Sequence, residues 1–127
     1  MRPLVRILLL VLATPLVLAA SPPPGSGERA HIMDALRPNF EGQLGGPVKF
    51  VVKRLVVDDN FAYVDVRPRQ KNGRPYRIQR PGWMDAYGGA VLEKKDGVWR
   101  VIDARLGPTD VWYCGWSSHF SGGLPDC

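Results

Sequence analysis

The chain has 127 residues, and 17 Lys and Arg against 12 Asp and Glu give it a formal net charge of +5. This length suits one domain of usual size. A charge this modest bears on solubility and on weak attraction to anionic surfaces rather than on the fold. It gives no reason to expect a nucleic-acid partner.

The first 20 residues have the three parts of a signal peptide. Arg2 and Arg6 precede an apolar run that reaches Leu18, and the small residues Ala19 and Ala20 close it. The run is shorter than the roughly 20 apolar residues that a membrane-spanning helix needs. We expect cleavage, export to a periplasm or to the medium, and no stable membrane anchor. An uncleaved anchor is the alternative.

Cys114 and Cys127 are the two cysteines of the chain, and both lie in its last segment. An even count indicates a disulfide in an oxidising compartment. The bond would tie down a tail rich in Gly, Ser and Pro. A metal site with His119 and Asp126 is one alternative, although its spacing matches no familiar zinc pattern. A redox pair is another, although no C-x-x-C motif is present. We expect no metal and no other cofactor.

Composition divides the chain into a signal peptide at 1–20, a Pro/Gly/Ser-rich tether at 21–27 and one domain at 28–127. The domain opens with apolar residues at near-helical spacing, namely Ala30, Met33, Leu36 and Phe40. Pro38 should end or kink this helix near Arg37, with a further short turn after it.

Strand signals dominate the rest of the domain. Two segments rich in β-branched residues, Val48–Val57 and Phe61–Val66, flank a tight turn and predict a hairpin in which Lys53 faces Asp65. The dipeptide at 72–73, Asn-Gly, predicts a second hairpin between 66–70 and 75–79. The prolines of this second hairpin, Pro68 and Pro75, suggest that it projects as an edge ribbon.

A third hairpin is predicted at Asp96-Gly97, after an irregular crossover at 83–89. A two-residue turn there would pair Glu93 with Arg100, Leu92 with Val101 and Val91 with Ile102. Both faces of this hairpin are apolar, so we expect a central position, with the helix on one face and the aromatic tail on the other.

One helix on a curved antiparallel sheet of four to five strands is the α+β architecture that this order predicts. It looks like the cystatin-like and NTF2-like rolls. The run GGAVLEKKDGVWRVIDARLGPTDVWY resembles a family of uncharacterised exported bacterial proteins with an ALRP-like helix end, a PVKFVV-like strand and a GPTDV turn in the same order. The resemblance covers most of 28–116 and departs at the hairpin of 67–80 and at the cysteine tail. It implies no catalytic residue.

The second hairpin carries the most distinctive candidate binding surface. Guanidinium groups there can clamp phosphates or carboxylates with paired hydrogen bonds. The alternative is a solvated edge whose charges prevent strand-to-strand aggregation. We call this set the basic ribbon: Arg67, Arg69, Lys71, Arg74, Arg77 and Arg80, interleaved with Tyr76.

Two catalytic candidates can be named, and each has a structural alternative. His31 shares a helix face with Asp34 and Glu28, which suits a general base or an ordinary exposed charge pair. Asp110, in the turn that begins at Gly107, can act in a cleft with Arg105 or, like its neighbour at 109, cap the following segment. No G-x-S-x-G, H-E-x-x-H, P-loop or G-x-G-x-x-G motif occurs.

Trp83, Trp112, Tyr113 and Trp116 can form a platform for sugar rings or simply the core. Our preferred hypothesis is a non-enzymatic exported module that binds an anionic or wall-associated partner through the basic ribbon or the aromatic tail. The alternative is a small ligand-binding roll or enzyme with an aromatic-lined pocket and an acid or base such as His31, Asp103 or Asp110. A filled core and a protruding basic hairpin favour the first hypothesis, and an enclosed cavity with an inward-facing His or Asp favours the second.

Overall fold

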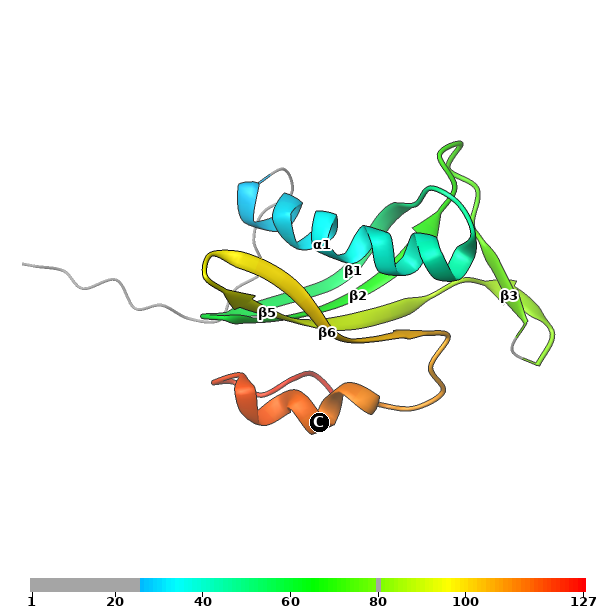
Figure 1. Cartoon of the computed structure of the whole chain (residues 1–127). Coiled ribbons are helices and arrows are strands. Elements are labelled where there is room, and N and C mark those ends of the chain that lie inside the picture. The colour runs from blue at the N-terminus through cyan, green and yellow to red at the C-terminus, as the bar shows by residue number, and fades with distance from the viewer. Residues whose placement is uncertain (1–25, 80) are drawn as a thin grey trace, which may run out of the picture.

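A long helix and a four-stranded antiparallel sheet form the body of the protein (Figure 1). The computed structural model describes residues 26–79 and 81–127, so the expected signal peptide and most of the tether lie outside the described residues. The sheet order is β1-β2-β5-β6, and β3 and β4 form a separate two-stranded sheet. The elements are α1 (Gly27–Leu44), β1 (Lys49–Asp58), β2 (Phe61–Arg69), β3 (Arg77–Gln79), β4 (Trp83–Asp85), β5 (Gly88–Lys95), β6 (Val98–Leu106) and the 3-10 helix η1 (Trp112–His119).

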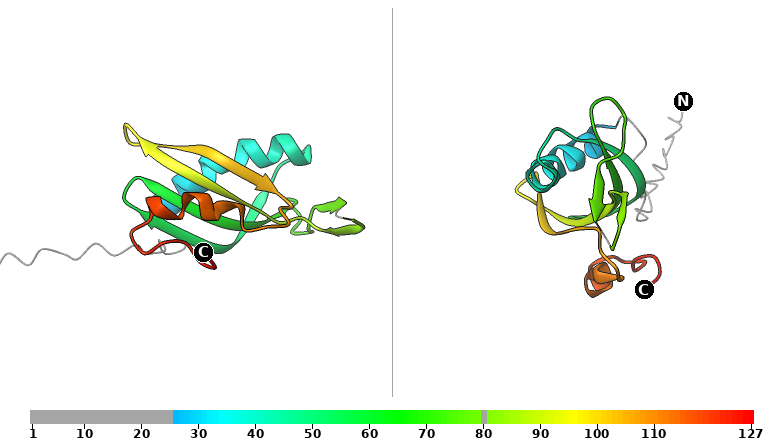
Figure 2. Two further views of the ribbon diagram at one scale, coloured as in Figure 1. Left: turned by 90° about the horizontal axis from the view of Figure 1, so that it is seen from below. Right: turned by 90° about the vertical axis from the view of Figure 1, so that its right-hand side faces the viewer.

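The sheet is covered on both faces, by α1 on one and by the C-terminal tail with η1 on the other (Figure 2). The larger core lies under α1, where Ile32, Leu36 and Phe40 are fully buried. The smaller core joins the sheet to the tail and contains Tyr63, Val91, Tyr113, Phe120 and Leu124. The predicted α+β class and the predicted covering of the third hairpin on both faces are therefore confirmed. In that hairpin β5 lies inside the sheet and β6 at its edge.

We predicted that Pro38 ends or kinks the helix near Arg37; α1 continues past Pro38 to Leu44, so the helix does not end there. Proline removes one helical hydrogen bond. The following turn still folds because Phe40 is buried completely in the larger core. The helix ends at Leu44 and is capped by Gly45, whose φ of 78° is easily adopted by glycine and whose N–H donates to the Glu41 carbonyl at 2.8 Å.

The first turn of α1 is capped by Ser26, whose hydroxyl oxygen accepts the N–H of Arg29 at 3.2 Å. The helix begins at Gly27, one residue before the expected start of the domain. Serine is a preferred residue at this position because its oxygen satisfies a backbone donor that has no helical partner. The end of the predicted tether is thus part of the folded domain.

A β-bulge corrects the register predicted for the first hairpin. Between Val52 and Arg54 the pairing with β2 shifts by one residue, so Arg54, and not Lys53, lies opposite Asp65. An extra residue of this kind is left unpaired and bends its strand. The bulge brings Arg54 to the face of the sheet that carries Asp65, which is the face of the tail.

A second bulge alters the third hairpin in the same way. The predicted pairs of Glu93 with Arg100 and of Leu92 with Val101 are confirmed, but the next residue of β5, Val91, lies opposite Asp103 and not opposite Ile102. Since opposite residues of an antiparallel pair share a face, the extra residue puts a carboxylate where an apolar side chain was expected.

The second hairpin has the predicted turn but only part of the predicted pairing. Gln70 N–H donates to Arg74 O at 2.8 Å across the turn, and a single bridge joins Arg69 to Pro75. The chain then leaves β2, and β3, which lies in the strand predicted at 75–79, pairs instead with β4, which lies in the segment 83–89 that we expected to be irregular. Proline has no N–H for a ladder bond, which explains why the pairing stops. Strand β2 itself pairs with β5 only as far as Val66.

Candidate functional site

A cleft of about 470 Å³ opens at the end of the sheet where β2 runs on beyond its pairing with β5. Three cations and one carboxylate share it with apolar side chains. Its lining residues are Lys53, Arg67, Pro68, Arg69, Pro75, Met84, Asp85, Ala86 and Tyr87. We call this feature the basic cleft.

Strand geometry places the cations of the basic cleft. Arg67 and Arg69 are two residues apart on β2, so both project from one face of the strand. Lys53 reaches the cleft from the bulge of β1, where the strand bends. Within the described ranges 26–79 and 81–127 we find no hydrogen-bond or ion-pair partner for the Lys53 amino group.

Arg67 is held in place by three neighbours. Its Nη1 donates to Asp65 Oδ1 at 2.7 Å and to the Val66 carbonyl at 3.2 Å, and its guanidinium lies 5.7 Å from the centre of the Tyr87 ring. Tyr87 is fixed in turn, because its hydroxyl donates to Pro108 O at 2.7 Å. A guanidinium has five N–H donors, so these contacts leave donors for a ligand.

Arg69 and Asp85 complete the charge of the basic cleft. Arg69 donates to the Gly73 carbonyl at 3.1 Å, which steadies the side chain without neutralising it. Asp85 forms a 3.4 Å ion pair with Arg77, which also donates to Trp83 O at 3.0 Å. The carboxylate of Asp85 is therefore compensated outside the cleft, and the cleft keeps a positive character.

The basic ribbon is divided among several places. Arg67 and Arg69 line the basic cleft, while Lys71 and Arg74 stand exposed at the turn between β2 and β3. Tyr76 does not join them, because its ring packs against the larger core and its hydroxyl donates to Pro47 O at 2.7 Å. The remaining two members are Arg77, which pairs with Asp85, and Arg80, which lies outside the described residues.

The aromatic residues do not assemble into one platform. Tyr113 packs on Tyr63 with ring centres 4.4 Å apart, and Trp112 lies under the guanidinium of Arg105 at 5.4 Å. Trp116 binds the sheet through a hydrogen bond from its indole N–H. Trp83 lies apart on β4 and is 67% exposed. The predicted platform is thus divided between the tail-side core and a separate hairpin.

Carboxylates of the sheet hold the tail, and their pKa values reflect it. Burial raises the pKa of Asp103, but hydrogen bonds from Arg105 at 3.0 Å and Trp116 at 3.2 Å outweigh this effect and lower it. Asp58 accepts the hydroxyl of Ser121 at 2.6 Å and also its backbone N–H, and both bonds lower the pKa of Asp58. These are bonds of structure rather than of acid–base chemistry.

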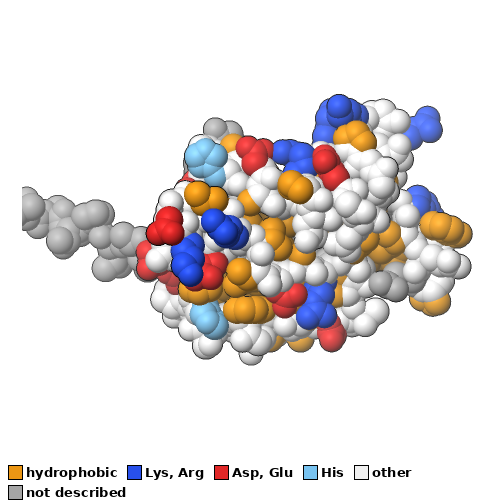
Figure 3. Space-filling view, in the orientation of Figure 1, with side chains coloured by type: hydrophobic (Ala, Val, Ile, Leu, Met, Phe, Trp, Pro, Cys, Tyr) orange, Lys and Arg blue, Asp and Glu red, His pale blue; other side chains and the backbone are white. Residues whose placement is uncertain are grey.

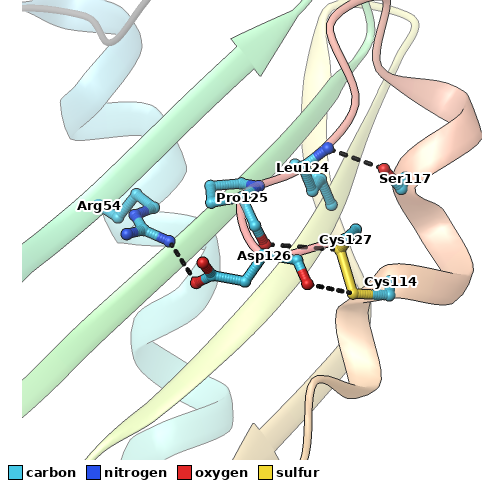
Figure 4. Close-up of a disulfide and its surroundings, with 7 residues drawn as sticks. All are labelled: Arg54, Cys114, Ser117, Leu124, Pro125, Asp126 and Cys127. Atoms are coloured by element: carbon cyan, nitrogen blue, oxygen red, sulfur yellow. Dashed lines mark hydrogen bonds and ion pairs between the residues drawn. A yellow bond between two sulfur atoms is a disulfide. The ribbon is translucent and has the colours of Figure 1, made fainter.

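A disulfide closes the tail as predicted. Cys114 and Cys127 are bonded, with Cα atoms 5.4 Å apart, and the segment between them is held by a hydrogen bond from Leu124 N–H to Ser117 Oγ at 2.8 Å (Figure 4). Arg54 of β1 pairs with Asp126 at 3.7 Å and fixes the chain end to the sheet. Both thiols are consumed, which excludes the alternative of a cysteine-ligated metal site.

His31 does not collect the partners that a general base needs. It is exposed on α1, and Asp34 pairs with Arg37 at 2.6 Å. Glu28 instead accepts the indole N–H of Trp99 at 3.1 Å. Across the described part of the chain, no group of three His, Cys, Asp or Glu side chains is placed to hold a metal ion.

Asp110 does not cap the following helix, so the predicted cap is wrong. The residue before η1 is Val111, which makes no side-chain capping bond. Asp110 lines a smaller hollow of about 250 Å³ between the sheet and the tail, and this hollow shares Arg67 and Tyr87 with the basic cleft. Its charge raises the pKa of Arg105, after the larger effect of Asp103.

Three residues of the cleft had no signal as site residues in the sequence. Lys53 was assigned to a cross-strand pair, because a bulge leaves no simple mark in the strand pattern. Met84 and Tyr87 fell in a segment expected to be irregular.

No family model, no curated protein and no solved structure matches the chain. Its function is therefore inferred from its own geometry.

Proposed function

We propose that the protein is an exported, non-enzymatic binding module that holds an anionic partner in the basic cleft. The observation that carries the proposal is the convergence of Lys53, Arg67 and Arg69 on one cleft that also has apolar walls. Phosphate and carboxylate groups are the natural ligands of such cations, since the guanidinium fork matches two oxygens at once.

The filled core supports a binding module over an enzyme with an enclosed pocket. Ile32, Leu36 and Phe40 are completely buried under the helix, and no polar or charged residue within the described ranges is buried. The basic cleft and the smaller hollow beside it both open to solvent. The sequence contains none of the four catalytic motifs named above. Acid–base catalysis needs a positioned group with a suitable partner, and His31 has no such setting.

The open form of the basic cleft suits a chain-like ligand. Met84 and Tyr87 offer apolar and aromatic surface beside the cations, as a ring or an aliphatic backbone requires. A wall-associated polymer with carboxylate or phosphate groups combines these properties. The signal-like first 20 residues and the disulfide support export, and one helix on a four-stranded antiparallel sheet supports a cystatin-like or NTF2-like roll.

Calorimetric titration with inorganic polyphosphate at low salt tests the proposal. We expect binding that weakens with added salt. The double variant Lys53→Gln/Arg69→Gln should bind at least tenfold more weakly, because charge-assisted hydrogen bonds are lost. Lys95→Gln/Arg100→Gln, with the same change in net charge at exposed positions of β5 and β6, is the control. Equal loss in both variants would show diffuse attraction and contradict the proposal.

A further inference from the structure

The β3–β4 hairpin exposes apolar side chains at the end of the molecule. Trp83 is 67% exposed and Met84 36%, and the hairpin forms its own two-stranded sheet outside the main one (Figure 1, Figure 2). Among the exposed large hydrophobic residues of the described chain, Trp83 has the highest exposed fraction. Because Trp83 and Met84 are neighbours in the chain, their exposed surface is a candidate contact for a partner.

The hairpin holds the backbone of Trp83 in place, and the side chain of Trp83 is exposed. Ile78 pairs with Met84 in the ladder, and Arg77 bonds both the Trp83 carbonyl at 3.0 Å and the Asp85 carboxylate at 3.4 Å. These bonds close the hairpin from one strand to the other. The backbone that carries the indole is therefore preformed, which lowers the entropic cost of ordering the backbone on binding.

Basic residues lie at the same end of the molecule, on the hairpin itself and on the β2–β3 turn, which forms a second projection (Figure 1). Lys71 and Arg74 are exposed at the β2–β3 turn, and the side chain of Arg77 is 56% exposed. The space-filling view shows Lys and Arg side chains together with hydrophobic ones at this right-hand end (Figure 3). Asp85 is the one carboxylate of β3 and β4 in the described residues, and Arg77 pairs with it.

We infer that this end of the protein docks on an anionic lipid bilayer, with the Trp83 indole in the interface and Lys71 and Arg74 on the lipid phosphates. Tryptophan favours the headgroup region, where its ring is apolar and its N–H stays wet. Basic residues near an anionic leaflet add attraction that salt screens. Such contact is peripheral and reversible. No helix of the described residues has the length and hydropathy that a bilayer crossing requires.

Charge argues against a second copy of this chain as the occupant. Two such ends would bring Lys71, Arg74 and Arg77 of each copy together around a small apolar contact. Like charges disfavour that arrangement, whereas an anionic surface neutralises them. The inference does not depend on the proposed function, because Trp83, Lys71 and Arg74 do not line the basic cleft.

Flotation with vesicles tests the inference. The exported form of the protein should bind vesicles of equal parts phosphatidylglycerol and phosphatidylcholine and should not bind phosphatidylcholine alone. Trp83→Ala should lower the partition coefficient about tenfold, as loss of a buried large apolar side chain predicts. Val98→Ala is the matched control, because Val98 is 53% exposed at the turn between β5 and β6. It should bind as the unchanged protein does.

A charge variant and a spectroscopic measurement complete the test. Lys71→Gln and Arg74→Gln should each weaken binding to the mixed vesicles about fivefold. The double variant Lys71→Gln/Arg74→Gln should weaken this binding more than the control Lys95→Gln/Arg100→Gln, which removes the same charge elsewhere. Brominated lipids should quench part of the tryptophan fluorescence, and this part should vanish in Trp83→Phe. Thermal unfolding checks that each variant keeps its fold.

Three results would overturn the inference. One is equal binding of Trp83→Ala and the unchanged protein to the mixed vesicles. Another is equal binding to charged and uncharged vesicles. The third is a concentration-dependent dimer in solution that Trp83→Ala abolishes, which would assign the surface to a second copy. Polyphosphate binding tests the basic cleft separately. Trp83→Ala should leave polyphosphate binding unchanged, whereas Lys53→Gln/Arg69→Gln should weaken it.

Discussion

The indole N–H of Trp116 donates to Oδ2 of Asp103 at 3.2 Å, and this bond fastens the C-terminal tail to the edge strand β6. The other carboxylate oxygen accepts from Arg105 at 3.0 Å. The bulge at Ile102 is what turns Asp103 to this face. A residue that we considered as an acid or base is therefore an anchor of the C-terminal tail.

Replacing Asp103 should loosen the tail. Asp103→Ala removes the acceptor of two hydrogen bonds and should lower the free energy of unfolding by about 1–3 kcal/mol. Urea titration followed by tryptophan fluorescence measures the change. Asp34→Ala breaks only an exposed pair on α1 and should cost less than about 0.5 kcal/mol. Similar losses in the two variants would contradict the anchoring role.

Acid should weaken the attachment of the tail. The pKa values of Asp58 and Asp103 lie below the ordinary 3.8 in the folded protein, so their contribution is present in full above that value and is lost as the pH falls through the lowered ones. The free energy of unfolding should therefore fall below about pH 4. Asp58→Asn/Asp103→Asn should show a smaller fall over the same range, and an unchanged pH dependence in this variant would argue against the assignment.

Replacing each of two glycines with alanine should change the stability of the protein in opposite directions. A Cβ on Gly88 would meet the Arg105 carbonyl oxygen at 2.5 Å and the Phe40 ring at 2.7 Å, so Gly88→Ala should destabilise by about 1–3 kcal/mol. A Cβ on Gly42 in α1 would meet nothing within 4 Å, and Gly42→Ala should stabilise by about 1 kcal/mol. Thermal unfolding of the two variants reports both signs, and a stabilised Gly88→Ala would contradict the close packing of α1 on β5.

Loss of the disulfide should free the tail. Cys114→Ser/Cys127→Ser removes a bond across a separation of 13 residues, which corresponds to about 3 kcal/mol in the chain-entropy model. Hydrogen exchange should then rise first in η1 and much less in α1, because each packs on its own core. Equal acceleration in both helices would mean that the two layers unfold as one unit.

Local patterns in the sequence predicted the elements and their layers well. The dipeptides at 72–73 and 96–97 mark real turns, and the apolar faces of β5 and β6 correctly predicted a helix on one side and the tail on the other. Turn residues and side-chain alternation are local properties, so they can be read without knowing what the strands contact.

Features set by tertiary packing were not predictable in this way. Proline disfavours the interior of a helix, but α1 continues past Pro38 because the next turn buries Phe40 in the larger core. The two bulges exchange Lys53 for Arg54 and Ile102 for Asp103 on the tail face, although nothing in the strand pattern marks either place. The basic cleft depends on the first bulge and on a hairpin with three-residue strands, so Arg67 and Arg69 could be identified from the sequence, but Lys53 and the walls of the cleft could not.

The most direct test of the proposed function is a nuclear magnetic resonance titration of the isotope-labelled protein with inorganic polyphosphate. Shifts should concentrate at the amides of Lys53, Arg67, Arg69 and Tyr87 and saturate together, while those of β6 and its turn with β5 remain unchanged. Saturable shifts confined to the basic cleft are the result that the proposal predicts. Shifts that follow every exposed cation without saturation, or no shifts at low salt, would contradict it.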